Sequence, residues 1–416
     1  MDKTKSFAIS KHAVWQAYRK VKANRGAAGV DEQSLAQFEQ DLKGNLYKLW
    51  NRMSSGTYFP PPVRLVEIPK KTGGVRPLGV PTVADRIAQT VAAQELEKVV
   101  EPIFDDDSYG YRPGRSAHDA LAVCRQRCWK FDWAVDLDVK AFFDSVDHQL
   151  MLKAVAHHTD QRWVLLYVKR WLQAPLQQRD GSLVERDRGT PQGSAISPVL
   201  ANLFLHYALD AWLRRVFPSV PFERYADDAI VHCTSLARAE QVQHAISARL
   251  VECGLQLHPD KTRIVYCKDG KRRGSHEHES FDFLGFTFQP RKAKDKYGRF
   301  FVSFLPAVSN TAAKAKRQEI RRWRLHLWTS QDLRDIAAFI NPKVRGWINY
   351  YGRFYRSRLS TTVLRQINEY LIRWAMRKYK RLRHSRRRAI SLLVRIARSD
   401  PDLFAHWRLL RLGSDG

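Results

Sequence analysis

Apolar residues recur along this chain at helical spacing in some segments and at strand spacing in others. Val14, Ala17, Tyr18 and Val21 follow a helical period, whereas 63–68 alternates apolar and polar side chains as a half-buried strand does. The same criteria predict helices within 9–55 and over 83–100, 117–129, 146–156, 163–172, 199–216 and 237–254, strands over 63–68, 75–80, 133–139, 262–266 and 281–289, and a hairpin over 222–233. We expect residues 291–416 to form a basic helical region. Together these elements indicate an α+β fold.

Composition excludes several classes of protein. A 44% apolar fraction with 12 Trp and 20 Phe supplies buried cores and argues against disorder. The most apolar stretch, 196–213, is interrupted by Asn202, His206 and Asp210, and the polar 1–10 segment lacks the apolar core of a signal peptide, so we expect neither a membrane span nor a leader. The five cysteines form no C-x-x-C pair, which disfavours a zinc ribbon and indicates a reducing compartment.

The charge is strongly positive and unevenly distributed. The formal net charge is +29, and residues 291–416 contribute 31 Lys and Arg against eight Asp and Glu. This basic segment also carries many aromatic residues, which indicates packed helices with a basic exterior. Such a surface attracts a polyanion, and nucleic acid is favoured over an acidic protein or a lipid surface.

Two groups of carboxylates stand next to predicted strands. Strand periodicity places Asp136 and Asp138 on one face of 133–139, and Asp227 and Asp228 lie between the two apolar runs of the predicted hairpin. Either pair alone could be ordinary turn chemistry. Together they could converge on a pair of divalent cations, for which Mg²⁺ is the natural ion, and such a pair stabilises phosphoryl transfer.

The chain carries several short motifs in sequence. They are Ile68-Pro69-Lys70, Arg76-Pro77-Leu78-Gly79, 108–115 (SYGYRPGR), 138–144 (DVKAFFD), 189–193 (GTPQG), 225–228 (YADD), Lys261-Thr262 and 283–285 (FLG). The order of these motifs resembles that of the reverse transcriptases encoded by bacterial group II introns, and the downstream segment 341–351 resembles the maturase domain of the same family.

This resemblance implies a right-hand polymerase with an antiparallel sheet in fingers and palm, followed by an all-helical thumb. The domains expected from it are an N-terminal helical extension of the fingers (1–62), the reverse transcriptase fingers and palm (63–290), a thumb and maturase domain (291–385), and a basic nucleic-acid-binding tail region (386–416). No endonuclease domain is expected, because the Cys-rich segment of endonuclease-bearing relatives has no counterpart after Cys267.

The resemblance also assigns the metal-binding acids. Asp138 and Asp227 would bridge two metal ions with Asp228 in a supporting part, and Val139 is included as a metal-binding position. Asp136 falls outside the motif, so we expect it to be structural. The implied cofactor is two Mg²⁺ ions, with Mn²⁺ able to substitute.

A second set of residues is implied to bind the incoming nucleotide. Lys70 and Arg76 would hold the triphosphate, although solvated hairpin charges are the alternative. Phe143 would lie under the sugar and exclude a ribose 2′-hydroxyl, although one ring of the Phe142-Phe143 pair is expected to be core. Gln192 and Gly193 would approach the sugar and the template base.

Further basic residues are weaker candidates. Lys261 matches a lysine suggested to act as general acid for the leaving pyrophosphate, with a surface lysine as the alternative. Arg112 and Arg115 could contact nucleic acid, or they could pair with the acidic residues 105–107. In the thumb, we expect an apolar helix face formed by Leu364, Ile367, Leu371 and Trp374. The nucleic-acid-binding candidates fall mainly outside this face, and they are Arg373, Arg377, Lys378, Lys380 and Arg381.

The implied activity is RNA-templated DNA synthesis from dNTPs by attack of a primer 3′-hydroxyl, together with binding of group II intron RNA for splicing and mobility. The expected partners are intron RNA, an RNA template, a DNA or RNA primer and dNTPs, in a prokaryotic, nucleoid-associated cytoplasmic setting. A domesticated reverse transcriptase in phage defence or DNA repair would carry the same motifs. Intact acids disfavour a non-enzymatic splicing cofactor, and the absence of Gly-Asp-Asp disfavours a viral RNA polymerase. Monomer and dimer both stay open.

Overall fold

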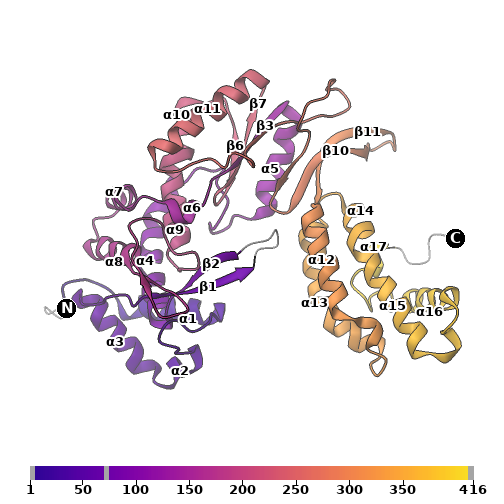
Figure 1. Cartoon of the computed structure of the whole chain (residues 1–416), viewed down its shortest axis with the longest axis horizontal. Coiled ribbons are helices and arrows are strands. Elements are labelled where there is room, and N and C mark those ends of the chain that lie inside the picture. Colours follow the sequence, from indigo (N-terminus) through magenta and orange to yellow (C-terminus); the bar gives the residue numbers. More distant parts are fainter. Residues whose placement is uncertain (1–4, 70–74, 411–416) are drawn as a thin grey trace. The chain divides into compact units, whose positions relative to one another are not determined.

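A computed structural model describes residues 5–69 and 75–410 (Figure 1). The chain divides into two compact units, Met1–Ala120 with Val135–Ile264, and Leu121–Ala134 with Val265–Gly416. Within the described ranges, no helix is both long and apolar enough to cross a membrane. Helices and strands are mixed, so the predicted α+β class is confirmed.

The N-terminal part of the first unit is helical, and it leads into a small sheet. Its elements are α1 (Lys11–Asn24), α2 (Leu35–Gln40), α3 (Leu42–Ser55), β1 (Val63–Pro69), β2 (Val75–Val80), α4 (Val83–Val100) and η1 (Glu101–Ile103). Ser10 caps α1 by accepting the Ala13 N–H, and Gly56 ends α3 in the left-handed conformation. The small sheet has the order β2-β1-β4-β5, with β1 antiparallel to β2 and parallel to β4.

The part of the chain from 117 to 266 builds a larger sheet and the helices around it, and its segments 121–134 and 265–266 belong to the second unit. Its elements are α5 (Ala117–Lys130), β3 (Trp133–Asp138), α6 (Phe142–Ser145), α7 (His148–His158), α8 (Arg162–Gln173), β4 (Leu176–Gln177), β5 (Leu183–Val184), α9 (Ser197–Leu205), η2 (His206–Asp210), α10 (Ala211–Val216), β6 (Phe222–Tyr225), β7 (Asp228–Cys233), α11 (Leu236–Glu252) and β8 (Arg263–Tyr266). The strand order is β6-β7-β3-β8. Helix α11 packs against β7, and the largely buried α4 packs against α1, α3, α7, α8 and α9.

The second unit combines a sheet with a bundle of helices. Its elements are β9 (Phe281–Phe283), β10 (Phe286–Lys294), β11 (Phe300–Val308), α12 (Asn310–Trp323), η3 (Leu325–Leu327), α13 (Leu333–Tyr351), α14 (Arg356–Leu359), η4 (Ser360–Leu364), α15 (Arg365–Lys378), η5 (Lys380–Leu382), α16 (Arg386–Ser399) and α17 (Trp407–Leu410). The sheet order is β11-β10-β9. Leu364, Ile367, Leu371 and Trp374 are all buried in the helical core, which confirms the predicted apolar face.

Two predictions at the start of the second unit were wrong. The apolar run 281–289 is two strands rather than one, because Leu284 and Gly285 both have positive φ (51° and 79°) and turn the chain between β9 and β10. Residues 291–308 are not helical either, because β10 continues to Lys294 and pairs with β11 along its whole length. The expected all-helical region therefore begins only at Asn310.

The part of the expected tail region that the structure describes, 386–410, packs against the helical bundle. Ala389 and Leu393 of α16, with Phe404 and Trp407, are buried in the same hydrophobic core as Trp374. The Asn341 side chain of α13 adds two hydrogen bonds to this segment, one to the Leu403 carbonyl and one from the Ala405 N–H, each 2.9 Å long. Residues 386–410 are therefore an integral part of the helical bundle.

One long predicted helix, 199–216, forms with an irregularity. Helices α9 and α10 are joined by the π-helical turn η2, so the helical run is continuous but locally widened. Periodicity does not reveal such a turn, because residues 199–205 are all buried and so form no one-sided apolar pattern that an extra residue could shift.

Candidate active site

Three carboxylates gather where β3 ends and β7 begins. Asp138 is the last residue of β3, Asp227 lies in the tight turn after β6, and Asp228 is the first residue of β7, the neighbour of β3 in the sheet. Desolvation by the surrounding protein raises the pKa of Asp227, and the negative charge of Asp138 raises it further. The pKa of Asp228 rises to about 6, although its surface stays accessible to solvent, because of desolvation and then the charges of Asp227 and Asp138. This mutual repulsion is the electrostatic signature of a site suited to cations.

The donor set fits a hard divalent cation, because it consists of carboxylate oxygens on rigid strand ends. Asp136, also on β3, is not among the charges that raise the pKa values of Asp227 and Asp228. Val139, the remaining metal-binding position of the prediction, is buried and forms an antiparallel bridge with Leu257. This bridge holds the backbone directly after Asp138.

Lys261 lies at the acidic group. Its Nζ is 3.0 Å from Oδ2 of Asp138, and both side chains are partly exposed. The backbone places the lysine there, because the His258 N–H donates to the Asp138 carbonyl (2.8 Å) and the Thr262 hydroxyl accepts the Asp138 N–H (3.4 Å). Lys261 therefore forms an ion pair with one of the three carboxylates.

A buried polar network supports the Tyr225–Asp228 turn. The Arg224 guanidinium forms a fully buried double hydrogen bond with Asp210 (2.8 and 2.6 Å), and it also donates to Asn202 and to the Ala226 carbonyl. Ala226 has a positive φ of 57°, so its backbone needs such support. The sequence reading missed this network, since an arginine within a short strand has no local signal of burial.

Gly110 brings a second loop against the same turn. A Cβ at this position would lie 2.3 Å from the Ala226 nitrogen, so only glycine allows this approach. The Gly110 carbonyl accepts a 2.7 Å hydrogen bond from Asn202, which joins the loop to the Arg224 network. Desolvation by the surrounding protein and then the charge of Asp227 raise the pKa of the phenol of the next residue, Tyr111, although half of its side chain is exposed.

The GTPQG segment lies against strand β2. The Gly79 N–H donates to the Gln192 carbonyl (2.7 Å), and Arg76 Nε donates to Gln192 Oε1 (2.5 Å). Gly193 has a φ of 110°, and a Cβ there would be 2.6 Å from the Gly79 carbonyl oxygen. The structure thus brings together three of the predicted nucleotide-binding residues, Arg76, Gln192 and Gly193. Lys70 lies outside the described residues.

Phe143 and Phe142 have different surroundings. Phe143 lines a cavity of about 300 Å³ with Pro77, Gly79 and Gln192, while Phe142 packs against Phe204. The two rings contact each other edge to face at 5.2 Å. Phe143 is therefore the ring that faces the predicted nucleotide-binding residues.

A buried carboxylate, Asp85, anchors the GTPQG segment from behind. It accepts hydrogen bonds from the Tyr58 hydroxyl (2.7 Å), the Trp171 indole (2.7 Å) and the Gln89 amide (2.9 Å). Gln89 Oε1 in turn accepts the Ala195 N–H (2.8 Å), which lies two residues after Gly193. Burial raises the pKa of Asp85 to about 6. Asp85 and Gln89 are thus positioning residues that the sequence pattern did not reveal.

Two predicted nucleic-acid contacts are engaged within their own loop. Arg112 is buried and binds the Glu101 carboxylate (2.9 Å) and the carbonyls of Asp105 and Ser108. Arg115 pairs with Asp106 at 2.7 Å. The alternative prediction, that these arginines pair with the acidic residues 105–107, fits Arg115. For Arg112 the carboxylate partner is Glu101 instead.

The basic candidates of the second unit lie on α15 and η5. Arg373, Arg377, Lys380 and Arg381 are exposed, whereas Lys378 is half-buried. Lys378 donates to the Gln331 carbonyl and lies over the Trp374 ring, so part of its role is structural. Burial and then the charges of Arg377, Arg373 and Arg324 lower the pKa of His326, which shows that these arginines are clustered.

Sequence comparisons match both parts of the chain. The profile of the reverse transcriptase (RNA-dependent DNA polymerase) family matches residues 68–288, and that of the group II intron maturase-specific domain matches 313–391. The group II intron-encoded protein LtrA of Lactococcus lactis subsp. cremoris is 31% identical over 217 residues, or 51% of this chain and 35% of LtrA. Protein YkfC of Escherichia coli K12 is 30% identical over 334 residues, or 70% of this chain and 84% of YkfC.

A longer match has lower identity. An uncharacterized 91 kDa protein in the cob intron of Schizosaccharomyces pombe is 26% identical over 448 aligned residues, covering 89% of this chain and 53% of that protein. The match with LtrA spans about a third of that protein's length. The family profile covers more than half of this chain and includes all three acids. The chain therefore belongs to the reverse transcriptase (RNA-dependent DNA polymerase) family and carries a group II intron maturase-specific domain.

Proposed function

We propose that this protein is an RNA-directed DNA polymerase that also binds group II intron RNA. Membership of the family implies a divalent metal ion, and we propose two Mg²⁺ ions held by Asp138, Asp227 and Asp228. The observation that carries the proposal is the convergence of these three carboxylates, two of which have raised pKa values because of desolvation by the surrounding protein and mutual repulsion.

The metal ions, when bound, stabilise charge on the attacking 3′-oxygen of the primer and on the leaving pyrophosphate. The chain's own residues would bind and orient the substrate. Arg76 is exposed beside Gln192 and offers a guanidinium fork for the triphosphate of a dNTP. Phe143 would lie below the sugar, where a 2′-hydroxyl would meet its ring.

Lys261 would change partner during the reaction. Its ammonium contacts Asp138 in the structure, and a divalent cation on that carboxylate competes with this ion pair. Once released, the ammonium would be available to donate a proton to the leaving pyrophosphate, the role that the family resemblance suggests.

The activity is tested by primer extension. The protein is given an RNA template, an annealed DNA primer and dNTPs, either with Mg²⁺ or with the metal chelated. We expect extension to the template end only with Mg²⁺, and preference for dNTPs over rNTPs. Absence of extension on RNA, or extension that survives chelation, would contradict the proposal.

The basic cluster of the second unit supports RNA binding. Arg373, Arg377 and Arg381 are exposed within or next to the maturase-specific match, and recognition of folded RNA relies on phosphate and shape contacts. We expect tighter binding to a group II intron RNA than to an unrelated structured RNA of the same length. Equal affinity for the two in a filter-binding titration would leave only non-specific binding.

A further inference from the structure

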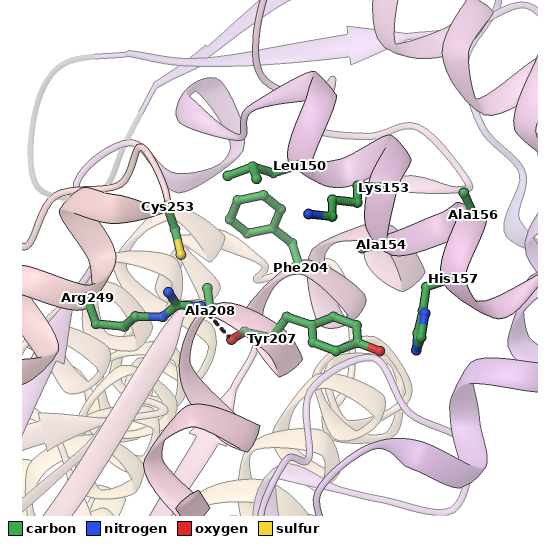
Figure 2. A pocket seen from close by; sticks show the side chains of 10 residues that line it. All are labelled: Leu150, Lys153, Ala154, Ala156, His157, Phe204, Tyr207, Ala208, Arg249 and Cys253. Atoms are coloured by element: carbon green, nitrogen blue, oxygen red, sulfur yellow. Dashed lines mark hydrogen bonds between the residues drawn. The ribbon is translucent and has the colours of Figure 1, made fainter. Parts of the chain in front are cut away.

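A cavity of about 500 Å³ lies in the first unit and shares no residue with the acidic cluster. Its walls come from α7, from the helical run through η2, and from the end of α11 (Figure 2). The residues that line it are Leu150, Lys153, Ala154, Ala156, His157, Phe204, Tyr207, Ala208, Arg249 and Cys253. The volume falls in the range of small-molecule sites, which is about 300 to 1,000 Å³.

The interior wall is apolar. Phe204 and Ala208 are buried among the core residues, and Phe204 lies beside Leu150 in the cavity wall (Figure 2). The ring of Phe204 is also packed against Phe142 on its inner side. Such a wall favours a flat hydrocarbon or aromatic group, because burial of that group removes apolar surface of both the ligand and the wall from water.

Two cations lie beside this apolar wall. Lys153 is exposed and has no ion pair among the described residues, and Figure 2 shows Lys153 and Arg249 reaching toward Phe204 and Ala208 from different walls. Arg249 donates to Glu252 (3.0 Å) and to the Tyr207 carbonyl (3.3 Å), but its Nε is buried without an acceptor in the described part of the chain. The Nε atom is out of reach of solvent, so a ligand would meet the remaining N–H groups of the partly exposed guanidinium, whose positive charge favours an anionic ligand.

The π-helical turn shapes the remaining wall. Tyr207 and Ala208 both belong to η2, and single π-turns within α-helices are frequently found at functional sites. Tyr207 is held in place by a stacked contact with His158 (5.7 Å between centroids) and by a hydrogen bond between the Tyr207 hydroxyl and His158 Nε2. The wall is therefore fixed before any ligand arrives.

We propose that this cavity binds a small aromatic anion, a fused ring system that carries a carboxylate or sulfonate. The rings lie against Phe204 and Ala208, and the anionic group pairs with the guanidinium of Arg249 and with Lys153. A nucleotide fits less well, because a base edge needs several hydrogen-bond partners and most of the wall is carbon.

The test is a fluorescence titration of the full chain with 8-anilinonaphthalene-1-sulfonate, which brightens in apolar sites. We expect saturable binding to one site. Arg249→Gln and Lys153→Glu should each raise the Kd about tenfold or more, since each removes a charge-assisted contact. Ala154→Trp should abolish binding by filling the cavity. Arg238→Gln, on the same helix but outside the cavity, is the matched control and should leave the Kd unchanged.

Several results would overturn the proposal. Binding that is unchanged in Ala154→Trp would locate the dye elsewhere. N-phenyl-1-naphthylamine, which lacks the sulfonate, should bind at least tenfold more weakly. Equal affinity for the two dyes would mean that the cavity does not recognise the negative charge, which contradicts the proposal. Displacement of the dye by AMP at lower concentration than by 1-naphthoate would assign a nucleotide instead. Lys153 is exposed, so its variant tests the charge even if Arg249→Gln does not fold.

Discussion

Phe142 and Phe143 are adjacent in sequence, yet only one of them faces the predicted nucleotide-binding residues. The motif spacing alone predicts Phe143 as this ring, and in the structure Phe143 lines the cavity beside Gln192. The acids could be selected in the same way, because their motifs are short and local. Arg224, Asp210 and Asn202 could not, because their contacts join residues that are distant in sequence.

At the residue scale, Phe143→Ala should relax sugar selection. Removal of the ring removes the clash with a ribose 2′-hydroxyl, so we expect the ratio of dNTP to rNTP incorporation to fall about tenfold or more. Single-nucleotide incorporation on an RNA template measures this ratio. Phe142→Leu is the control, because it alters the contacts of Phe142 with Phe204 and Phe143 but leaves in place the ring that faces the predicted nucleotide-binding residues. A Phe143→Ala protein that still rejects rNTPs would assign the selection to another group.

Elements that are far apart in sequence meet around the nucleotide-binding loop. Helix α4 reaches the GTPQG segment through Asp85, Gln89 and the Ala195 N–H. The bounds of α4 could be predicted from periodicity, but this hydrogen-bonded chain could not. The β9–β10 turn and the π-turn η2 were missed for a related reason, because a continuous apolar run conceals local changes in backbone geometry.

Asp85, which links α4 to the GTPQG segment, makes the stability of the folded protein depend on pH. Its pKa rises from 3.8 to about 6 on folding, so protonation stabilises the folded state, and this contribution is fully present below pH 4 and is lost as the pH rises through 6. Asp85→Asn removes the titration. We therefore expect the free energy of unfolding of the parent, minus that of the variant, to be about 1 kcal/mol larger at pH 5 than at pH 7.

Urea denaturation at the two pH values measures this difference. Comparison of the parent with the variant cancels the acidic groups that titrate in both proteins. A difference that is the same at pH 5 and pH 7, or larger at pH 7, would mean that Asp85 does not carry a raised pKa in the folded protein.

At the scale of the whole molecule, the excess positive charge is concentrated in the second unit. Sequence composition predicts where this excess lies. The structure corrects the predicted elements that carry it, because 291–308 is a hairpin rather than helical and 386–410 packs in the helical core rather than forming a tail. Counting charges could not separate exposed arginines from Lys378, which is partly engaged by Gln331 and Trp374.

The combined variant Arg373→Gln, Arg377→Gln and Arg381→Gln should weaken binding to RNA and reduce its salt dependence. Each lost phosphate contact lowers the slope of log affinity against log salt by about 0.7 to 0.9. Affinity measured at several salt concentrations gives this slope. Lys98→Gln, which removes an exposed lysine paired with Glu95, is the control. An unchanged slope in the combined variant would exclude these arginines from the RNA interface.

The central claim is that Asp138, Asp227 and Asp228 together perform nucleotidyl transfer. Its most direct test is the rate of single dNTP incorporation on an RNA template by Asp227→Asn, compared with the parent and with Asp260→Asn, a change at an exposed aspartate beside Lys261. We predict that Asp227→Asn lowers the rate by about a thousandfold or more, as expected for loss of a charged group that acts in the transition state, and that Asp260→Asn has little effect. Synthesis by Asp227→Asn at a rate close to that of the parent would contradict the claim.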